Sequence, residues 1–263
     1  MDAVSDEYDF IRSVDSIWSV GSSSHEWMSK TFVKKYADKI SETTHVSTNP
    51  YAKRVFDDGI YPPHAYTTPF DLSSWNVVNK SEFCYTEWLT EHVDPYLKDR
   101  GIEVNASAEY PTDRAILAGR NTDCEKLLVH YFQPHRPFIG HLDRNENLAP
   151  EMDYPYEAVQ KGEISTEELW ESYLDNLRYA LDNISILLNN LDARKVVITA
   201  DHGELHGEWK AFGHPEGVPH PALKKVPWIE TTASDDMTYE PESNIEYKRD
   251  YDPEEHLREL GYI

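Results

Sequence analysis

The stretch that most constrains this chain is Lys195–Pro215. It opens with a β-branched apolar run, Lys195–Ala200, which predicts a buried parallel strand. Asp201 and His202 follow directly, and Gly203 then allows a sharp backbone turn. In an open α/β sheet, ligands bind at the carboxyl ends of the strands, where this carboxylate and imidazole would lie. The tripeptide alone fits a turn with a helix N-cap equally well.

A second imidazole, His214, follows between Gly213 and Pro215. An adjacent Asp and His with a downstream His form a plausible ligand set for a divalent cation. The strings VITADHGE, GHP and LKKVPW (Leu223–Trp228) resemble the C-terminal half of the alkaline phosphatase superfamily, and its sulfatase-like branch in particular. The resemblance implies that Asp201 and His202 bind metal, and that His214 is a metal ligand or a substrate contact.

The same resemblance implies an alkaline-phosphatase-like α/β fold, with a central, mostly parallel sheet and helices on both faces. Residue patterns predict strands at Thr44–Asn49 and Lys126–Phe132 and an amphipathic helix at Glu26–Ile40. A capping box at Ser165–Glu168 starts a long helix to about Leu191, which leads into the Lys195 strand as in a doubly wound sheet. Pro227 predicts that Val226–Ile229 is an edge strand.

The chain begins MDAVSDEYDF, without the apolar strand that an α/β sheet normally places first. In the sulfatase-like family that strand ends in a metal-binding Asp, within a string like Leu-Asp-Ala-x-x-Tyr-Asp. Asp2-Ala3 and Tyr8-Asp9 look similar, so the resemblance makes Asp2 a third metal ligand whose strand is missing. The competing interpretation is a frayed acidic terminus.

Serines gather just before the Glu26 helix, where they would serve as N-caps. The family places its nucleophile at a helix N-terminus, in a string like Cys-x-Pro-Ser-Arg, and alignment on that string puts Ser19 at the nucleophile, with Ser22 as second choice. Helix N-terminal amides favour an anion, which suits a bound sulfate or phosphate. Gly21 in place of Pro and Ser23 in place of Arg depart from the family pattern.

The Lys126 strand ends in His130 and runs into QPHRPFIG, which resembles the family string His-x-x-x-Pro-His-x-Pro-Phe. The resemblance directs His130 and His135 at the ester oxygens, where imidazoles donate hydrogen bonds or protonate a leaving group. Arg136 would add a charge-assisted contact. A lone histidine in a strand is more often a core residue.

The formal charge of −23 over 263 residues argues against nucleic acid or an anionic membrane as partner. The acids are scattered along the chain, which favours a surface adapted to high salt, as in halophilic proteins, over an affinity for basic partners. Cys84 and Cys124 allow one disulfide, but two free thiols are favoured. No run of 18 apolar residues and no signal-type core occurs, which predicts a cytoplasmic protein without membrane insertion.

The combined prediction is a metal-dependent hydrolase or transferase of small-molecule or glycan sulfate or phosphate esters. Ser19 attacks beside one divalent cation, with Mn²⁺ or Zn²⁺ favoured over Ca²⁺ because imidazole is a ligand. The alternatives are an inactive relative acting as a binding or scaffold protein, favoured by the missing strand, and an acidic interaction protein without a pocket. Two units are expected, 1–230 as the α/β domain and 231–263 as an acidic arm with a helix at Pro253–Leu260. The oligomeric state stays open.

Overall fold

The structure is a computed structural model of the 263-residue chain, and it describes every residue except 61–75, 98–101, 103–106, 141, 143–146 and 246–263. The helix predicted at Pro253–Leu260 lies outside the described residues. The strands are β1 (Asp15–Trp18), β2 (Thr43–Ser47), β3 (Tyr85–Trp88), β4 (Lys126–His130), β5 (Asn190–Thr199), β6 (Leu205–His206), β7 (Phe212–Gly213) and β8 (Lys225–Asp235). The α-helices are α1 (Ser24–Thr31), α2 (Ala37–Ile40), α3 (Tyr51–Phe56), α4 (Glu109–Asn121), α5 (Pro150–Asp153), α6 (Pro155–Lys161), α7 (Thr166–Leu188) and α8 (Pro221–Lys224).

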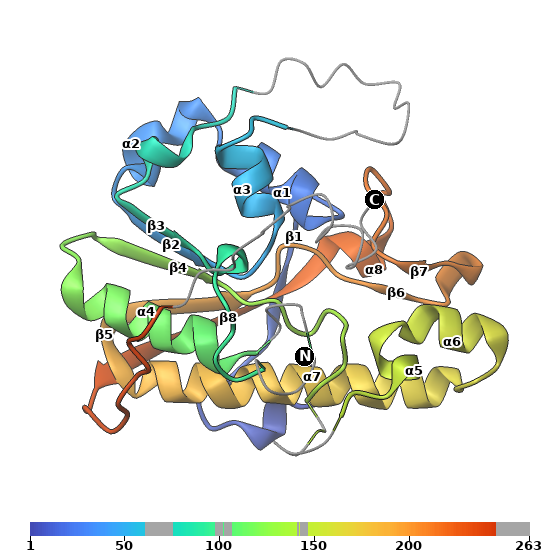
Figure 1. Ribbon diagram of the computed structural model, residues 1–263. Helices are drawn as coiled ribbons and strands as arrows, with labels where there is room; N and C mark the ends of the chain where they lie inside the picture. The colour runs from blue at the N-terminus through green and yellow to red at the C-terminus, as the bar shows by residue number, and fades with distance from the viewer. Residues whose placement is uncertain (61–75, 98–101, 103–106, 141, 143–146, 246–263) are drawn as a thin grey trace.

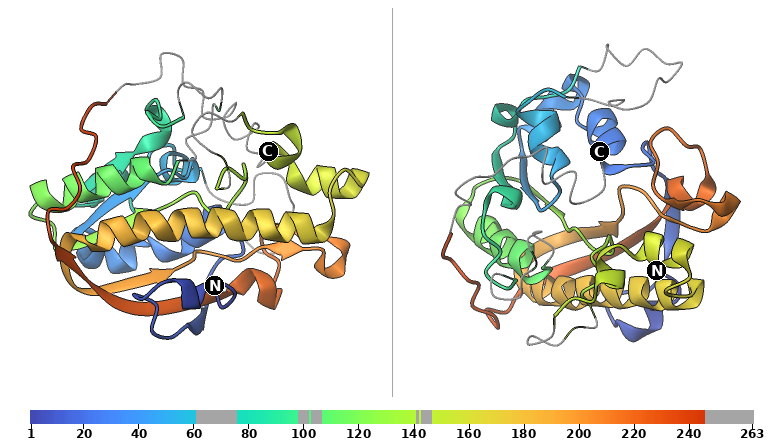
Figure 2. Two further views of the ribbon diagram at one scale, coloured as in Figure 1. Left: turned by 90° about the horizontal axis from the view of Figure 1, so that it is seen from below. Right: turned by 45° about the vertical axis from the view of Figure 1, so that its right-hand side comes forward.

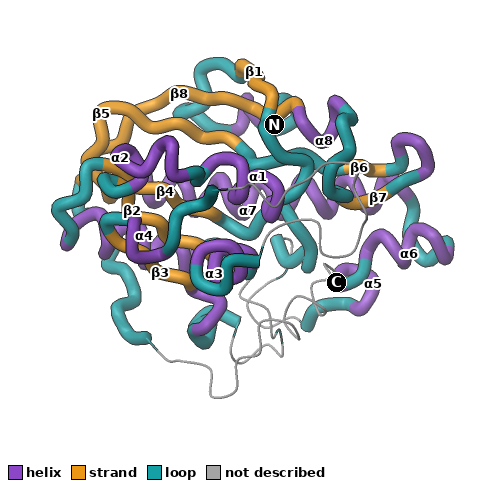
Figure 3. Tube along the Cα trace, turned by 90° about the horizontal axis from the view of Figure 1, so that it is seen from above, coloured by secondary structure: helices purple, strands orange, loops and turns teal. Residues whose placement is uncertain are grey.

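The described strands form two three-stranded sheets and one short pair, β6–β7 (Figures 1 and 3). The order β3-β2-β4 is parallel throughout, whereas β1-β8-β5 is antiparallel throughout. Helix α4 packs on one face of the parallel sheet, and α1 and α3 pack on the other. The α/β class and the strands predicted around Thr44 and Lys126 are therefore confirmed, but the parallel part of the fold has only three strands among the described residues.

Two predictions about strand pairing were wrong. Strand β5, expected to be buried and parallel, pairs antiparallel with β8 through Ile198↔Ile229, and only two of its ten residues are buried. Strand β8, expected at an edge because of Pro227, lies between β1 and β5. An apolar run does not encode whether a strand pairs parallel or antiparallel. Here the central strand β8 contains a proline, so one backbone N–H donor is missing from its hydrogen-bond ladder.

Helix α7 forms where local signals predict it, although it ends at Leu188, short of Leu191. The Ser165 side chain accepts from the N–H of Glu168, and the Glu168 carboxylate accepts from the N–H of Ser165, which completes the capping box. The apolar stripe of the helix packs along β5 and β8, as Figure 2 shows from below. Leu188, Ile198 and Ile229 form the buried centre of that contact.

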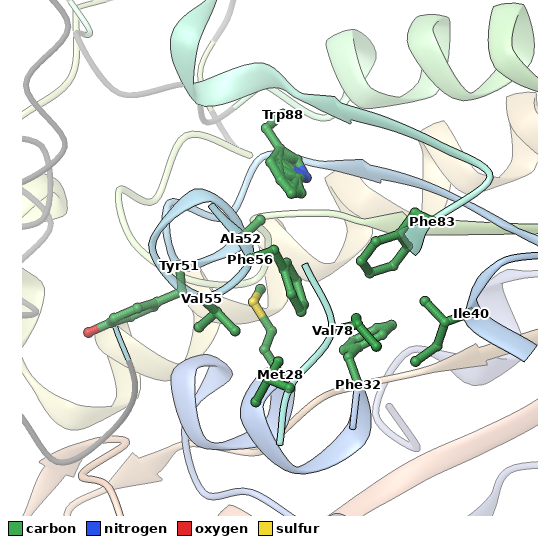
Figure 4. Packing of buried hydrophobic residues seen from close by; sticks show 11 residues of the cluster. Met28, Phe32, Ile40, Tyr51, Ala52, Val55, Phe56, Val78, Phe83 and Trp88 are labelled. Atoms are coloured by element: carbon green, nitrogen blue, oxygen red, sulfur yellow. The ribbon is translucent and has the colours of Figure 1, made fainter. Parts of the chain in front are cut away.

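The single helix predicted at Glu26–Ile40 is interrupted. Helix α1 ends at Thr31, Val33 is extended and bridges Val77, and helix resumes at Ala37 after a 3-10 turn. The N–H of Val78 also donates to the Phe32 carbonyl. This pairing places Phe32 in an aromatic cluster shown in Figure 4, where burial outweighs the continuity of the helix. The cluster fixes α1, and with it the serines at its start.

Cys84 and Cys124 form a disulfide, so the prediction of two free thiols was wrong. Cys84 directly precedes β3 and Cys124 lies two residues before β4, and these two strands flank β2 in the parallel sheet. Parallel strands begin at the same edge, which brings the two Cα atoms to 6.0 Å. Sequence spacing alone does not show this proximity. No helix of the described residues is long and apolar enough to cross a membrane, and the cytoplasmic location stays a prediction.

The N-terminal residues form a 3-10 turn at Ser5–Glu7 before β1 begins. Val4 is buried against α7, and Asp2 is exposed. Toward the C-terminus, β8 continues past position 230 to Asp235, so the expected domain boundary falls within a strand.

Candidate functional site

Polar side chains converge where β4 and β5 end and α1 begins. His130 is the last residue of β4, Asp201 follows β5 by two residues, and Ser24 is the first residue of α1. Together with His135 and Glu204 they line a cavity of about 220 Å³. The carboxyl ends of the two strands therefore meet at one site, although β4 and β5 belong to different sheets.

Asp201 is buried among imidazoles. Its Oδ1 accepts from the N–H of His202 at 2.9 Å, and its Oδ2 lies 3.4 Å from His130 Nε2 and 3.7 Å from His202 Nε2. Burial alone would raise the pKa of Asp201, but His202 and His130 outweigh it and hold the pKa well below its usual value. Asp201 is thus an anion at neutral pH. Within the described part of the chain, no donor makes a hydrogen bond to its buried Oδ2.

His202 orients Ser24. The Nδ1 of His202 lies 2.7 Å from the Gly203 carbonyl, which can only accept, so Nδ1 carries the proton. Nε2 is then the acceptor for the Ser24 hydroxyl, 3.2 Å away. Burial lowers the pKa of His202, although Asp201 partly offsets it. A neutral imidazole facing a serine hydroxyl is the arrangement of a general base and its nucleophile.

Ser24 sits at the N-terminus of α1 because Ser23 caps that helix, accepting from the N–H of Glu26 at 3.2 Å. Sequence reasoning missed Ser24, and the signal was available: it is the last of three consecutive serines before the predicted helix. Helix N-terminal amides and the macrodipole favour negative charge near this hydroxyl.

The two serines predicted as nucleophile, Ser19 and Ser22, instead make hydrogen bonds that fix the segment before α1. The Ser19 hydroxyl donates to the Asp201 main-chain carbonyl and accepts from the N–H of Gly21 at 3.2 Å. The Ser22 hydroxyl is fully buried, 2.9 Å from both the Glu26 carboxylate and the Pro215 carbonyl. Both contacts attach the start of α1 to the segment that follows β5.

His202, Glu204 and His214 form a compact group in which one ligand atom of each residue lies within 4.8 Å of the others. His214 Nδ1 is 3.0 Å from Glu204 Oε2. Burial would raise the pKa of Glu204, but His214, His135 and His202 lower it to about 2. Burial would lower the pKa of His214, but Glu204 raises it above the usual value. Without metal, Glu204 is therefore ionised at neutral pH, and its charge favours the protonated form of His214.

The donor chemistry of this group fits a divalent cation. Two imidazoles and one carboxylate are a common open site for Zn²⁺ and other first-row metals. His202 and His214 were predicted as ligands, whereas Glu204 was not, although it stands in the quoted VITADHGE string. Asp201 borders the group through His202, and the exposed Asp2 lies outside it.

His135 and Arg136 differ in what they contact. The His135 ring packs 5.2 Å from the His214 ring, and burial lowers the pKa of His135 to about 3. Arg136 instead donates to the Asp153 carbonyl at 2.8 Å and lies over the Tyr154 ring. It therefore supports the α5–α6 segment beside the site.

Comparisons with family models, with curated proteins and with solved structures find no match for this chain. The sulfatase-like family and its activity accordingly stay predictions that rest on the sequence strings.

Proposed function

We propose that this protein hydrolyses sulfate or phosphate esters with Ser24 as the nucleophile, or transfers the sulfuryl or phosphoryl group to another acceptor. The observation that carries the proposal is the Ser24 hydroxyl, which lies 3.2 Å from the Nε2 of a neutral His202 at a helix N-terminus. This replaces Ser19, the serine that the family string favours, with the serine that faces an imidazole.

The reaction would use groups already in place. His202 Nε2 takes the Ser24 proton while Oγ attacks the sulfur or phosphorus, and the protonated His202 then returns that proton to the leaving ester oxygen, which departs as an alcohol. The first amides of α1 favour the charge on the transferred group. His130 is held beside Asp201 and lines the same cavity, where its ring would contact an ester oxygen. Water then releases the group from Ser24.

A divalent cation on His202, Glu204 and His214 would take the same Nε2 lone pair, so His202 would then hold the cation in place of accepting the Ser24 proton, and the cation would supply the positive charge that lowers the pKa of the serine hydroxyl. The predicted Mn²⁺ or Zn²⁺ is consistent with this donor set.

The test is turnover of para-nitrophenyl sulfate and para-nitrophenyl phosphate by Ser24→Ala and Ser19→Ala, with the exposed Ser41→Ala as matched control. Ser24→Ala is expected to lose on the order of a millionfold in kcat, as nucleophile removal does. Ser19→Ala should keep its chemistry but unfold at lower denaturant, because a bond to Asp201 is lost. Parental kcat in Ser24→Ala would refute the assignment. A parent that binds Zn²⁺ but turns over neither ester would favour the inactive, binding role.

A further inference from the structure

Strands β4 and β5 run in the same direction but do not pair. At their starts, Leu127 and Leu191 share one apolar cluster, and at their ends His130 contacts Asp201. The described residues provide no backbone hydrogen bond between the two strands, because β4 pairs only with β2 and β5 only with β8. The contact at the ends is made by the side chains of His130 and Asp201, and the two strands are not hydrogen-bonded neighbours in either sheet.

The open edge of β4 can be assigned residue by residue. The carbonyl of His130 accepts from Thr48 and the N–H of Lys126 donates to Glu42, so these residues direct their backbone groups toward β2. Residues alternate along a strand, and therefore Leu127, Val129 and Tyr131 direct theirs the other way, toward β5. No described residue bonds to those groups. Residues 127–130 are also only half-buried, although a central parallel strand is normally buried on both faces.

The space between the two edges is the cavity of the site, extended along the strands. Val129, Ile198, Leu177, Leu181 and Ile184 line it, the last three from α7. Met1 lines it as well. A ligand that fills this cavity would have to cover the apolar walls on the α7 side. It would also have to pair with the backbone groups of the two facing strand edges.

We infer that the gap between β4 and β5 is a docking site for an extended apolar segment of a partner polypeptide, about five residues long and rich in Val, Ile or Leu. Such a strand pairs with both edges at the usual spacing of roughly 4.8 Å and joins the two sheets into one. An aliphatic ligand would fill the apolar walls but would leave the N–H and C=O groups of Leu127 and Val129 unpaired.

The experiment titrates the full chain with a fluorescent hexapeptide of Val and Ile carrying a lysine tail, read by anisotropy. The matched control is the same peptide with alternate amides N-methylated, which keeps the side chains and removes donors to one edge. Two or three lost hydrogen bonds should weaken binding on the order of tenfold or more. Ala180→Phe, which fills the cavity from α7, should abolish binding, whereas Glu171→Phe on the exposed side of α7 should not.

Equal affinity for both peptides would overturn the inference, because binding would then depend on apolar contacts alone. A lack of binding by the parent peptide would overturn it too. If light scattering detects a dimer and the peptide dissociates it, the occupant is a second copy of this chain. That result would also overturn the inference of a partner polypeptide. None of these results depends on ester turnover, so failure of this inference is distinct from failure of the proposed function.

Discussion

Replacing Cys84 and Cys124 by serine should cost about 4 kcal/mol of unfolding free energy. The disulfide closes a loop with a sequence separation of 40 residues. Loop-closure entropy for that length, about 13 cal/mol/K, gives about 4 kcal/mol at 25 °C. The bond also joins the starts of β3 and β4 across β2, so its loss loosens the sheet that carries His130.

The assay is urea unfolding followed by tryptophan fluorescence, with thiol titration of the denatured chain. The oxidised parent should show no free thiol, and the reduced parent should show two and lose the same stability as the double serine variant. The reduced parent is the matched control, because it changes no side-chain volume. Two thiols in the protein purified without reductant, or equal urea midpoints for all three forms, would refute the reasoning.

Four further outcomes follow from particular contacts. Asp94 is buried, which raises its pKa to about 6. The folded state therefore holds more protons than the unfolded state between pH 4 and 6, so the unfolding free energy should fall by about 3 kcal/mol as pH rises through that window. Asp94→Asn should flatten this pH dependence of the unfolding free energy. An unchanged pH dependence in the variant would contradict the assignment to Asp94. Ser165→Ala should lower the thermal midpoint through loss of about 1 kcal/mol, whereas Thr166→Ala should not. A Cβ at Gly203 would meet the Ala222 carbonyl oxygen at 2.0 Å, so Gly203→Ala should destabilise by about 1–3 kcal/mol in urea unfolding, and a neutral result would show that the turn relaxes freely. Glu204→Gln should weaken Zn²⁺ binding more than about tenfold by calorimetry, while Asp2→Asn should leave it unchanged; the reverse order would restore the ligand set expected from the sequence.

What could be predicted from the sequence depends on how local its cause is. Helix α7 was predicted because its capping box and apolar stripe act within a few turns. Strands β2 and β4 were predicted because each is a short apolar or β-branched run with a clear end. Asp201 and His202 were placed at a strand end for the same reason, since they directly follow such a run.

The remaining features depend on contacts between distant residues. The bridge from Val33 to Val77 interrupts a helix that its own periodicity supports. The pairing of β5 with β8 sets a strand direction that an apolar run does not encode. The choice of Ser24 over Ser19 follows from where α1 begins relative to His202, 178 residues away in sequence.

By itself, then, the sequence determined the α/β class, the long helix and a set of histidines and acids of the types that a metal site uses. Only the tertiary structure decided which serine meets His202, that Glu204 joins His202 and His214, and that β4 and β5 leave facing edges open. The physical reason is that propensity and capping act over a few residues, whereas these arrangements arise from burial and pairing between segments that the chain brings together only when it folds.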